Sequence, residues 1–223
     1  MSDATTRPAA FQLSRESRVL FIGDSITDAG RGADKEEQIG NGYVRLVRDS
    51  FRAKDPATAP HVINRGISGN KITDLSARWE RDVVASDPHL LSVMIGINDV
   101  WHGLNPAWAP GVDIDDYTAI YRDLLARTRK GLPNCRVVLM EPTVIDPPAP
   151  AEGNEKLQPY VKAVNALAKE FAGTVVAAVP THSAFVNART ARPDIVWAPD
   201  GVHPSTSGHM LIARTWLATT GLL

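Results

Sequence analysis

The chain has 223 residues, 43% of them hydrophobic, which is enough for one domain with a sizeable buried core. Its 24 basic and 25 acidic residues leave a formal net charge of −1, so no field of one sign is available to gather nucleic acid or an anionic membrane. We therefore expect neither of these partners. The single cysteine, Cys135, has no partner for an internal disulfide and is interpreted as a packing residue.

The first segment, residues 1–17, is polar and mixed in charge. It lacks the apolar stretch that a signal peptide or a membrane span requires. We interpret residues 1–17 as a flexible arm and residues 18–223 as a single domain, and we expect a cytoplasmic location.

Short apolar runs alternate with segments of helical periodicity along the rest of the chain. The predicted strands are residues 19–22, a second run from 61, then 90–95, 136–140 and 174–179, and the predicted helices are about 41–53, 72–86, 113–130, 155–172, 183–188 and a last one from 204. Strands that alternate with helices predict a doubly wound α/β fold, with a parallel sheet of about five strands and right-handed crossovers.

Small or polar residues stand where the apolar runs end. Ser25 follows the first run, Gly66 the second and Asn98 the third, while Asp200 and His203 precede the last helix. The carboxyl ends of parallel strands meet at one edge of a sheet, which is where ligands bind in open α/β folds. We therefore expect these residues to form one site.

These residue types are the ones that acyl transfer needs. Ser25 is the candidate nucleophile, His203 the general base, and Asp200, three residues earlier, the carboxylate that orients the imidazole. The backbone N–H groups of Ser25 and Gly66 and the side-chain amide of Asn98 are the candidate oxyanion donors.

Four short motifs together resemble the SGNH hydrolases of the GDSL esterase family. They are Gly23-Asp24-Ser25, Gly66, Gly96-Ile97-Asn98-Asp99 and Asp200-Gly201-Val202-His203. The resemblance implies a three-layer α/β/α, flavodoxin-like fold. It also implies a Ser25, Asp200 and His203 triad with an oxyanion hole of Ser25, Gly66 and Asn98.

The longer phrases around these motifs, such as residues 64–70 and 94–101, are similar to bacterial acetylxylan esterases and related carbohydrate deacetylases. This similarity implies hydrolysis of acetyl esters on saccharides such as xylo-oligosaccharides. A lysophospholipase or thioesterase of the same superfamily is the alternative, although such an enzyme needs an apolar groove and the loops here offer tryptophan and polar residues. A carbohydrate-binding protein without turnover is the alternative from another class.

Four further side chains are candidates for contacting substrate. Trp101 and Trp108 stand in a segment, residues 100–111, that we expect to be a loop, where either could stack on a sugar ring or close the core. Trp197 lies in the loop that leads to Asp200 and His203. Asp24 precedes the nucleophile and is equally well explained as a cap of the turn.

Other chemistries fit the sequence less well. Ser68 does not lie in the Gly-x-Ser-x-Gly elbow of α/β-hydrolases, because residue 70 is Asn. His182, His203 and His209 are too widely spaced for a zinc helix motif, so we expect no metal and no cofactor. In the last predicted helix we interpret His209 as structural and expect Met210 to pack inward. A homo-oligomer is compatible with the sequence, which specifies no contact face.

Overall fold

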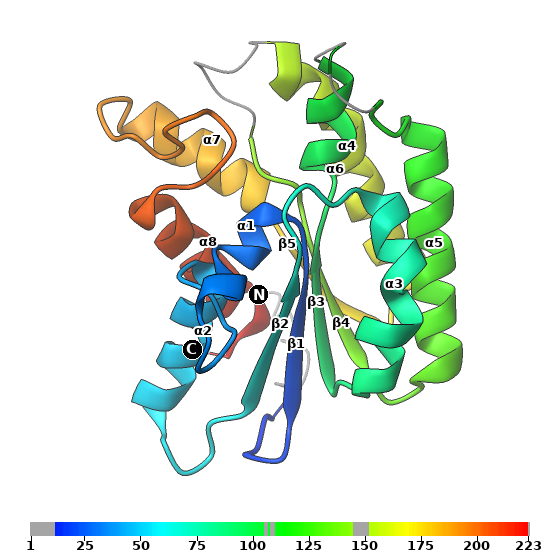
Figure 1. Cartoon of the computed structure of the whole chain (residues 1–223), viewed down its shortest axis with the longest axis vertical. Coiled ribbons are helices and arrows are strands. Elements are labelled where there is room, and N and C mark those ends of the chain that lie inside the picture. The colour runs from blue at the N-terminus through cyan, green and yellow to red at the C-terminus, as the bar shows by residue number, and fades with distance from the viewer. Residues whose placement is uncertain (1–11, 105–106, 108–109, 145–151, 223) are drawn as a thin grey trace, which may run out of the picture.

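The computed structural model describes residues 12–104, 107, 110–144 and 152–222. Its centre is a sheet of five parallel strands in the order β2-β1-β3-β4-β5 (Figure 1). The strands are β1 (Arg18–Gly23), β2 (His61–Gly66), β3 (Leu90–Met94), β4 (Arg136–Met140) and β5 (Val175–Val179). Strand number, direction and fold class agree with the sequence-based prediction.

Helices cover both faces of the sheet (Figure 1). The α-helices are α1 (Ser25–Asp28), α2 (Tyr43–Lys54), α3 (Ile72–Asp82), α4 (Ile97–Trp101), α5 (Ile114–Gly131), α6 (Glu152–Glu170), α7 (Thr181–Ala191) and α8 (Thr206–Thr220). Three short 3₁₀ turns are η1 (Arg31–Ala33), η2 (Val84–Ser86) and η3 (His102–Leu104). Helices α2 and α8 pack together on one face, and α3, α5 and α6 pack on the other.

The core fills both interfaces between the sheet and the helices. On the α2 and α8 side, the Trp216 ring lies 5.3 Å from that of Phe21 and 6.2 Å from that of Phe51, and its Nε1–H donates to Ser92 Oγ at 3.0 Å. On the other side, Tyr117 is fully buried and its hydroxyl donates to the Ile95 carbonyl at 3.0 Å. Both aromatic polar atoms are therefore satisfied inside the core.

Helix starts follow the chemistry of their first residues. Asp113 accepts from the backbone N–H groups of Asp115 and Asp116 and caps α5, as its position in the sequence predicts. Helix α2 begins after Gly42, which has no side chain to cap it. Instead the Nδ1 of His209, on α8, accepts the Tyr43 N–H at 3.2 Å. This contact supports the structural interpretation of His209 and ties α8 to α2.

Two expectations about helices are wrong. Residues 100–111 are not all loop, because the chain turns at Gly96, with φ 129°, directly into α4. Met210 does not pack inward: it is 44% exposed, because the buried face of α8 is formed by Ile212, Ala213, Trp216 and Leu217.

Residues 12–17 lead into β1 and are tied to the domain. Ser17 donates its N–H to the Ser14 carbonyl, and its own carbonyl accepts the His61 N–H at 2.9 Å. Leu13 packs against the core. Only residues 1–11 of the predicted arm lie outside the described part.

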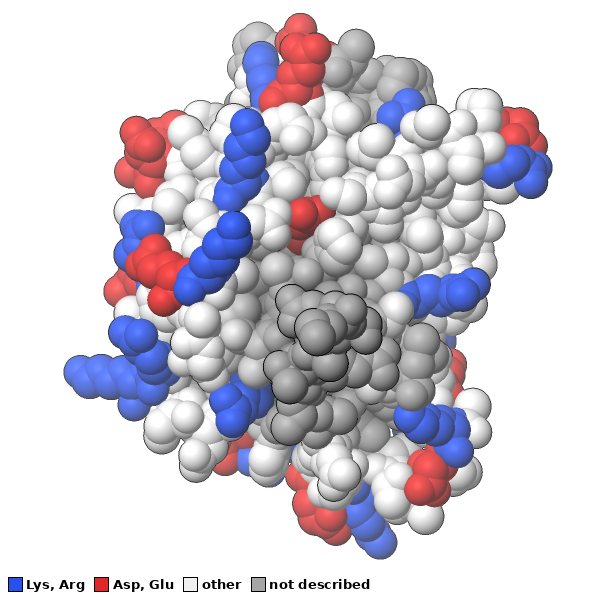
Figure 2. Space-filling model, turned by 180° about the vertical axis from the view of Figure 1, so that it is seen from behind, with Lys and Arg blue, Asp and Glu red and all other residues white. Residues whose placement is uncertain are grey.

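Basic and acidic side chains are interspersed on the face shown in Figure 2. Among the described residues, no helix combines the length and apolar composition that crossing a membrane requires.

Candidate active site

The turn after β1 positions Ser25. Glycine is required at position 23, because a Cβ there would lie 2.2 Å from the Met94 carbonyl oxygen on β3. Asp24 then caps α1, its Oδ1 accepting the Ile26 N–H at 3.0 Å. Ser25 is the first residue of that helix, and α1 directly follows the carboxyl end of β1 (Figure 1).

Ser25, His203 and Asp200 form a hydrogen-bonded chain, as the sequence predicts. The Ser25 Oγ lies 2.8 Å from His203 Nε2, and His203 Nδ1 lies 2.6 Å from Asp200 Oδ2. The other carboxylate oxygen of Asp200 accepts the N–H groups of Val202 at 2.9 Å and His203 at 2.7 Å. A carboxylate at Nδ1 fixes the proton there and leaves Nε2 free to accept the serine proton.

The electrostatics keep Asp200 ionised. Partial burial raises the pKa of its carboxyl, but hydrogen bonds from the His203 ring and from the backbone N–H groups of His203 and Val202 outweigh that effect, so the pKa lies below its usual value. The side chains of His203 and Asp200 are 53% and 57% exposed. The chain of three groups is therefore open to a bulky alcohol.

Two of the expected oxyanion donors are available. The Ser25 N–H, at the first position of α1, has no acceptor among the described residues. Asn98 is 5% exposed, and its Nδ2 donates to the Asn70 carbonyl at 3.1 Å. That bond uses one of the two amide hydrogens and leaves the other free.

The N–H of Gly66, the third expected donor, is already used by a hydrogen bond inside the protein. Its N–H donates to Asn64 Oδ1 at 2.8 Å in the buried interior, and a Cβ at this position would lie 2.2 Å from the Asp28 nitrogen. Gly66 is thus required for close packing against α1. Gly69, three residues on, has φ 81°, open space around it and an N–H without an acceptor in the described part of the chain. The sequence signal, a second glycine in the same turn, was present but was not assigned a role.

Asp24 is buried below the nucleophile turn. It is 1% exposed, and burial raises the pKa of its carboxyl to about 7, an effect that the Ile26 N–H and the nearby His203 only partly offset. The bond to the Ile26 N–H supports its interpretation as a cap, and its assignment as a substrate ligand stays a prediction.

Trp101 and Trp197 contact the core from its border. Trp101, on α4, and Trp197 are both partly buried and pack against the core. Trp197 donates its indole N–H to the Arg192 carbonyl at 3.2 Å, and its own carbonyl accepts the Ser205 N–H at 2.8 Å, which braces the loop that carries Asp200. Trp108 lies outside the described residues.

The environments of two other candidate nucleophiles, Ser68 and Cys135, do not favour attack on a substrate. Ser68 donates its hydroxyl to Asp28 Oδ2 at 2.8 Å. Burial raises the pKa of the Cys135 thiol to about 12, so it carries almost no thiolate at neutral pH. Within the described ranges, no group of three or more His, Cys, Asp or Glu side chains is placed to hold a metal ion.

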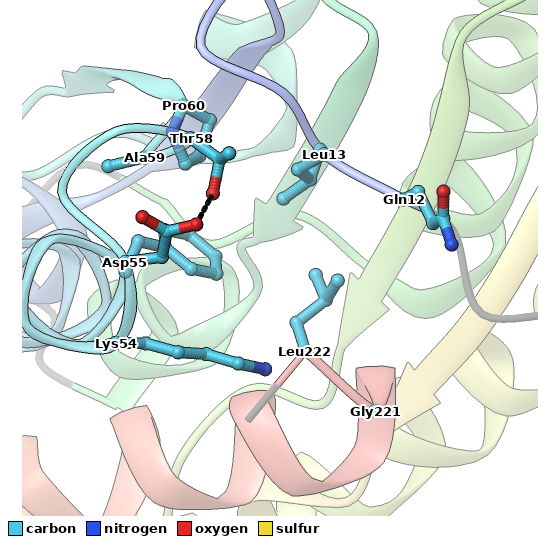
Figure 3. Close-up of a pocket in the computed structure, with 10 residues that line it drawn as sticks. Gln12, Leu13, Lys54, Asp55, Thr58, Ala59, Pro60, Gly221 and Leu222 are labelled. Carbon is cyan, nitrogen blue, oxygen red and sulfur yellow. Dashed lines mark hydrogen bonds between the residues drawn. The ribbon is translucent and has the colours of Figure 1, made fainter.

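A separate hollow of about 330 Å³ lies at the opposite edge of the sheet, beside the amino ends of β1 and β2 (Figure 3). Leu13, Lys54, Pro60 and Leu222 line it, and the Thr58 hydroxyl beside them donates to Asp55 at 2.7 Å. None of its lining residues belongs to the Ser25 site.

Comparison with known proteins gives the class of this protein. The model of the GDSL-like lipase/acylhydrolase family matches residues 21–211, so the chain belongs to that family. It is a carboxylic ester hydrolase.

Among its relatives, an acetylxylan esterase of Geobacillus stearothermophilus is 38% identical over 223 positions, which cover 92% of this chain and 94% of the relative. A structure of Axe2, an acetylxylan esterase from that organism, gives a TM-score of 0.81 at 36% identity and covers 94% of this chain and 97% of its own. A structure of a mutant of Axe2, described as an acetyl-xylooligosaccharide esterase, gives a TM-score of 0.83 at 35% identity. The alignment covers 95% of this chain and 97% of the mutant's chain. The structure of a GDSL-like lipase from Parabacteroides merdae gives a TM-score of 0.86 at 36% identity. The alignment covers 95% of this chain and 99% of the lipase chain.

Proposed function

We propose that this enzyme removes acetyl groups from saccharides such as xylo-oligosaccharides through an acetyl-enzyme formed on Ser25. The observation that carries the proposal is the pair of short contacts, Ser25 Oγ to His203 Nε2 and His203 Nδ1 to Asp200. Together they describe an activated serine with an oriented base.

In the proposed mechanism, Ser25 Oγ attacks the acetyl carbonyl while His203 Nε2 takes its proton. Asp200 stabilises the imidazolium that results. The tetrahedral intermediate collapses as His203 returns the proton to the leaving sugar hydroxyl. A water molecule, deprotonated by the same nitrogen, then attacks the acetyl-enzyme, and acetate leaves with Ser25 restored.

The oxyanion in both steps needs donors that already point at it. We assign this role to the Ser25 N–H and the free amide hydrogen of Asn98. For the third donor, the contacts favour the Gly69 N–H over that of Gly66, whose hydrogen is used by Asn64. The side-chain amide of Asn98, on α4, contacts the carbonyl of Asn70, the residue after Gly69, so this bond ties the Asn98 donor to the turn that carries Gly69.

The choice of an acetylated saccharide has two supports. Relatives that align over nearly the whole chain are acetylxylan and acetyl-xylooligosaccharide esterases. In addition, His203 and Asp200 are more than half exposed, which suits a large polar alcohol better than a buried acyl chain. A lysophospholipase or thioesterase activity remains the alternative within the family.

The test is acetate release from acetylated xylo-oligosaccharides, compared with hydrolysis of a long-chain ester. Ser25→Ala is the blank, and Ser50→Ala is the matched control, because the Ser50 hydroxyl bonds only the Leu46 carbonyl on α2. Acetate release that Ser25→Ala abolishes and Ser50→Ala retains would support the proposal. Preference for the long-chain ester would move the enzyme to the lipid or thioester branch.

A serine-directed phosphonate separates the enzyme from a binding protein without turnover. Labelling of Ser25 is expected, and folded protein that stays unlabelled would contradict the mechanism. The cytoplasmic location and a homo-oligomer stay predictions, which cell fractionation and sedimentation would test.

A further inference from the structure

Arg78 is a buried cation that lies beneath the site without belonging to it. It is on α3 and is 6% exposed. Its Nε donates to Asn70 Oδ1 at 2.8 Å, its Nη1 to the Arg65 carbonyl at 2.8 Å and its Nη2 to the Gly23 carbonyl at 3.1 Å. One side chain thus bonds the carboxyl end of β1, the carboxyl end of β2 and the loop that follows β2.

Each of these acceptors belongs to a residue that lies next to a group of the site in the chain or is bonded to one. The Gly23 carbonyl belongs to the peptide that leads into Asp24 and Ser25. The side chain of Asn70 is bonded by Arg78, while the backbone carbonyl of Asn70 receives the Asn98 amide. The Arg65 carbonyl opens the turn that runs through Gly69. Arg78 therefore contacts the nucleophile turn, the glycine turn and the residue that orients Asn98.

The charge of Arg78 is balanced on its own helix. Its Nη1 also donates to Asp82 Oδ2 at 2.8 Å, and Arg81 bonds the same carboxylate at 2.8 Å. Burial raises the pKa of Asp82, but hydrogen bonds from Arg81 and Arg78 outweigh it, so the pKa lies below its usual value and the carboxylate stays ionised. The buried guanidinium is thus paired and hydrogen-bonded, as a buried charge must be.

We propose that Arg78 is a positioning residue, whose guanidinium sets the distance and angle between Ser25 and two oxyanion donors, the Gly69 N–H and the Asn98 side chain that the Asn70 carbonyl orients. The inference rests on the proposed function. Only a planar fork with five N–H groups can reach acceptors in these separate directions, and a lysine ammonium at the same place cannot. Arg78 has no access to substrate, so its effect is on the transition state through the loops.

The decisive variant is Arg78→Lys, which keeps the charge for Asp82 and loses the fork. Arg81→Lys is the matched control: Arg81 lies on the same helix and bonds the same carboxylate, but its side chain is 72% exposed and no bond joins it to Gly23, Arg65 or Asn70 in the described part of the chain. The assays are kcat and KM on a small aryl acetate, and the rate and end point of phosphonate labelling of Ser25. The end point counts competent sites, so kcat is expressed per folded site.

We expect Arg78→Lys to lower kcat and the labelling rate about 10- to 100-fold, as a shift of donors by about 1 Å would. KM and the labelling end point should change less than about twofold, since substrate binding and the fold are retained. Arg81→Lys should match the wild type. In Arg78→Ala, guanidinium chloride below the concentrations that unfold the protein should restore part of the labelling rate, whereas urea should not.

Wild-type kcat and labelling rate in Arg78→Lys would overturn the proposal. So would a loss of activity that is fully explained by a lower labelling end point, because Arg78 would then act only on stability. The labelling rate does not depend on knowing the natural ester, so it decides the role of Arg78 even if acetylated saccharides prove to be the wrong substrate. Wild-type protein that neither hydrolyses esters nor labels would refute the mechanism and this inference together.

Discussion

Replacement of Asp99 by asparagine should change how the stability of the protein depends on pH. Asp99 is in the first turn of α4 and is 2% exposed. Its Oδ1 accepts the Ile72 N–H at 3.0 Å, while Oδ2 has no hydrogen-bond partner among the described residues. Burial raises its pKa from 3.8 to about 7, and the neighbouring charge of Asp24 adds to the rise.

The difference between the folded and unfolded pKa of Asp99 makes the protein less stable as pH rises. Between pH 3.8 and about 7 the unfolded chain releases the Asp99 proton while the folded protein keeps it, so the free energy of unfolding falls as pH rises through this window. The full shift corresponds to about 4 kcal/mol, of which about 3 kcal/mol is lost between pH 5 and pH 8. Asparagine keeps an acceptor for the Ile72 N–H and cannot ionise.

Urea unfolding of the wild type and Asp99→Asn at pH 5 and pH 8 measures the effect. Between pH 5 and pH 8, the free energy of unfolding of the variant should rise by about 3 kcal/mol relative to that of the wild type. Asp116→Asn, at an exposed position on α5, is the control and should follow the wild type. Stability curves of wild type and Asp99→Asn that run parallel over this range would refute the reasoning.

Two other predictions concern His209 and Trp101. Burial, with a smaller contribution from the His203 charge, lowers the pKa of His209 from 6.5 to about 4, so stability is lost as pH falls from 6.5 to 4, by about 3 kcal/mol in all. His209→Gln keeps an acceptor for the Tyr43 N–H and should remove this loss in denaturation measured at pH 7 and pH 4; an unchanged acid sensitivity would contradict the assignment. If Trp101 stacks on a sugar, Trp101→Ala should raise KM for acetylated xylo-oligosaccharides and leave that for a small aryl acetate unchanged. Equal losses on both substrates would mean that Trp101 only packs.

The fold was largely predictable because the local signals agree with one another. Apolar runs such as residues 136–140 become strands with the same limits, and Asp113 starts a helix where its capping chemistry predicts one. The helix at residues 97–101 was missed, because it depends on a backbone angle at Gly96 that composition does not reveal.

That Ser25 and His203 lie together was predictable, because the chemistry of each residue is rare and its position is fixed by a motif. The oxyanion donors were less predictable, because the direction of each N–H group decides whether it faces the site. Whether Gly66 or Gly69 offers its N–H depends on a bond to the buried Asn64, which sequence spacing does not specify. Arg78 looks in sequence like any charged residue of an exposed helix face, and only the packing of α3 under the loops reveals its burial.

Helix α8 has a consequence for the order of events during synthesis. Asp200 and His203 immediately precede this helix, and its Trp216 covers Phe21 and Ser92 on the two central strands. Until the ribosome has released the chain through Thr220, that face of β1 and β3 lacks its cover and Ser25 lacks its base. Before α8 docks, Ser25 is therefore expected to be an inert serine beside an apolar sheet face that chaperones can bind, and we expect hydrolytic activity only after this helix has docked.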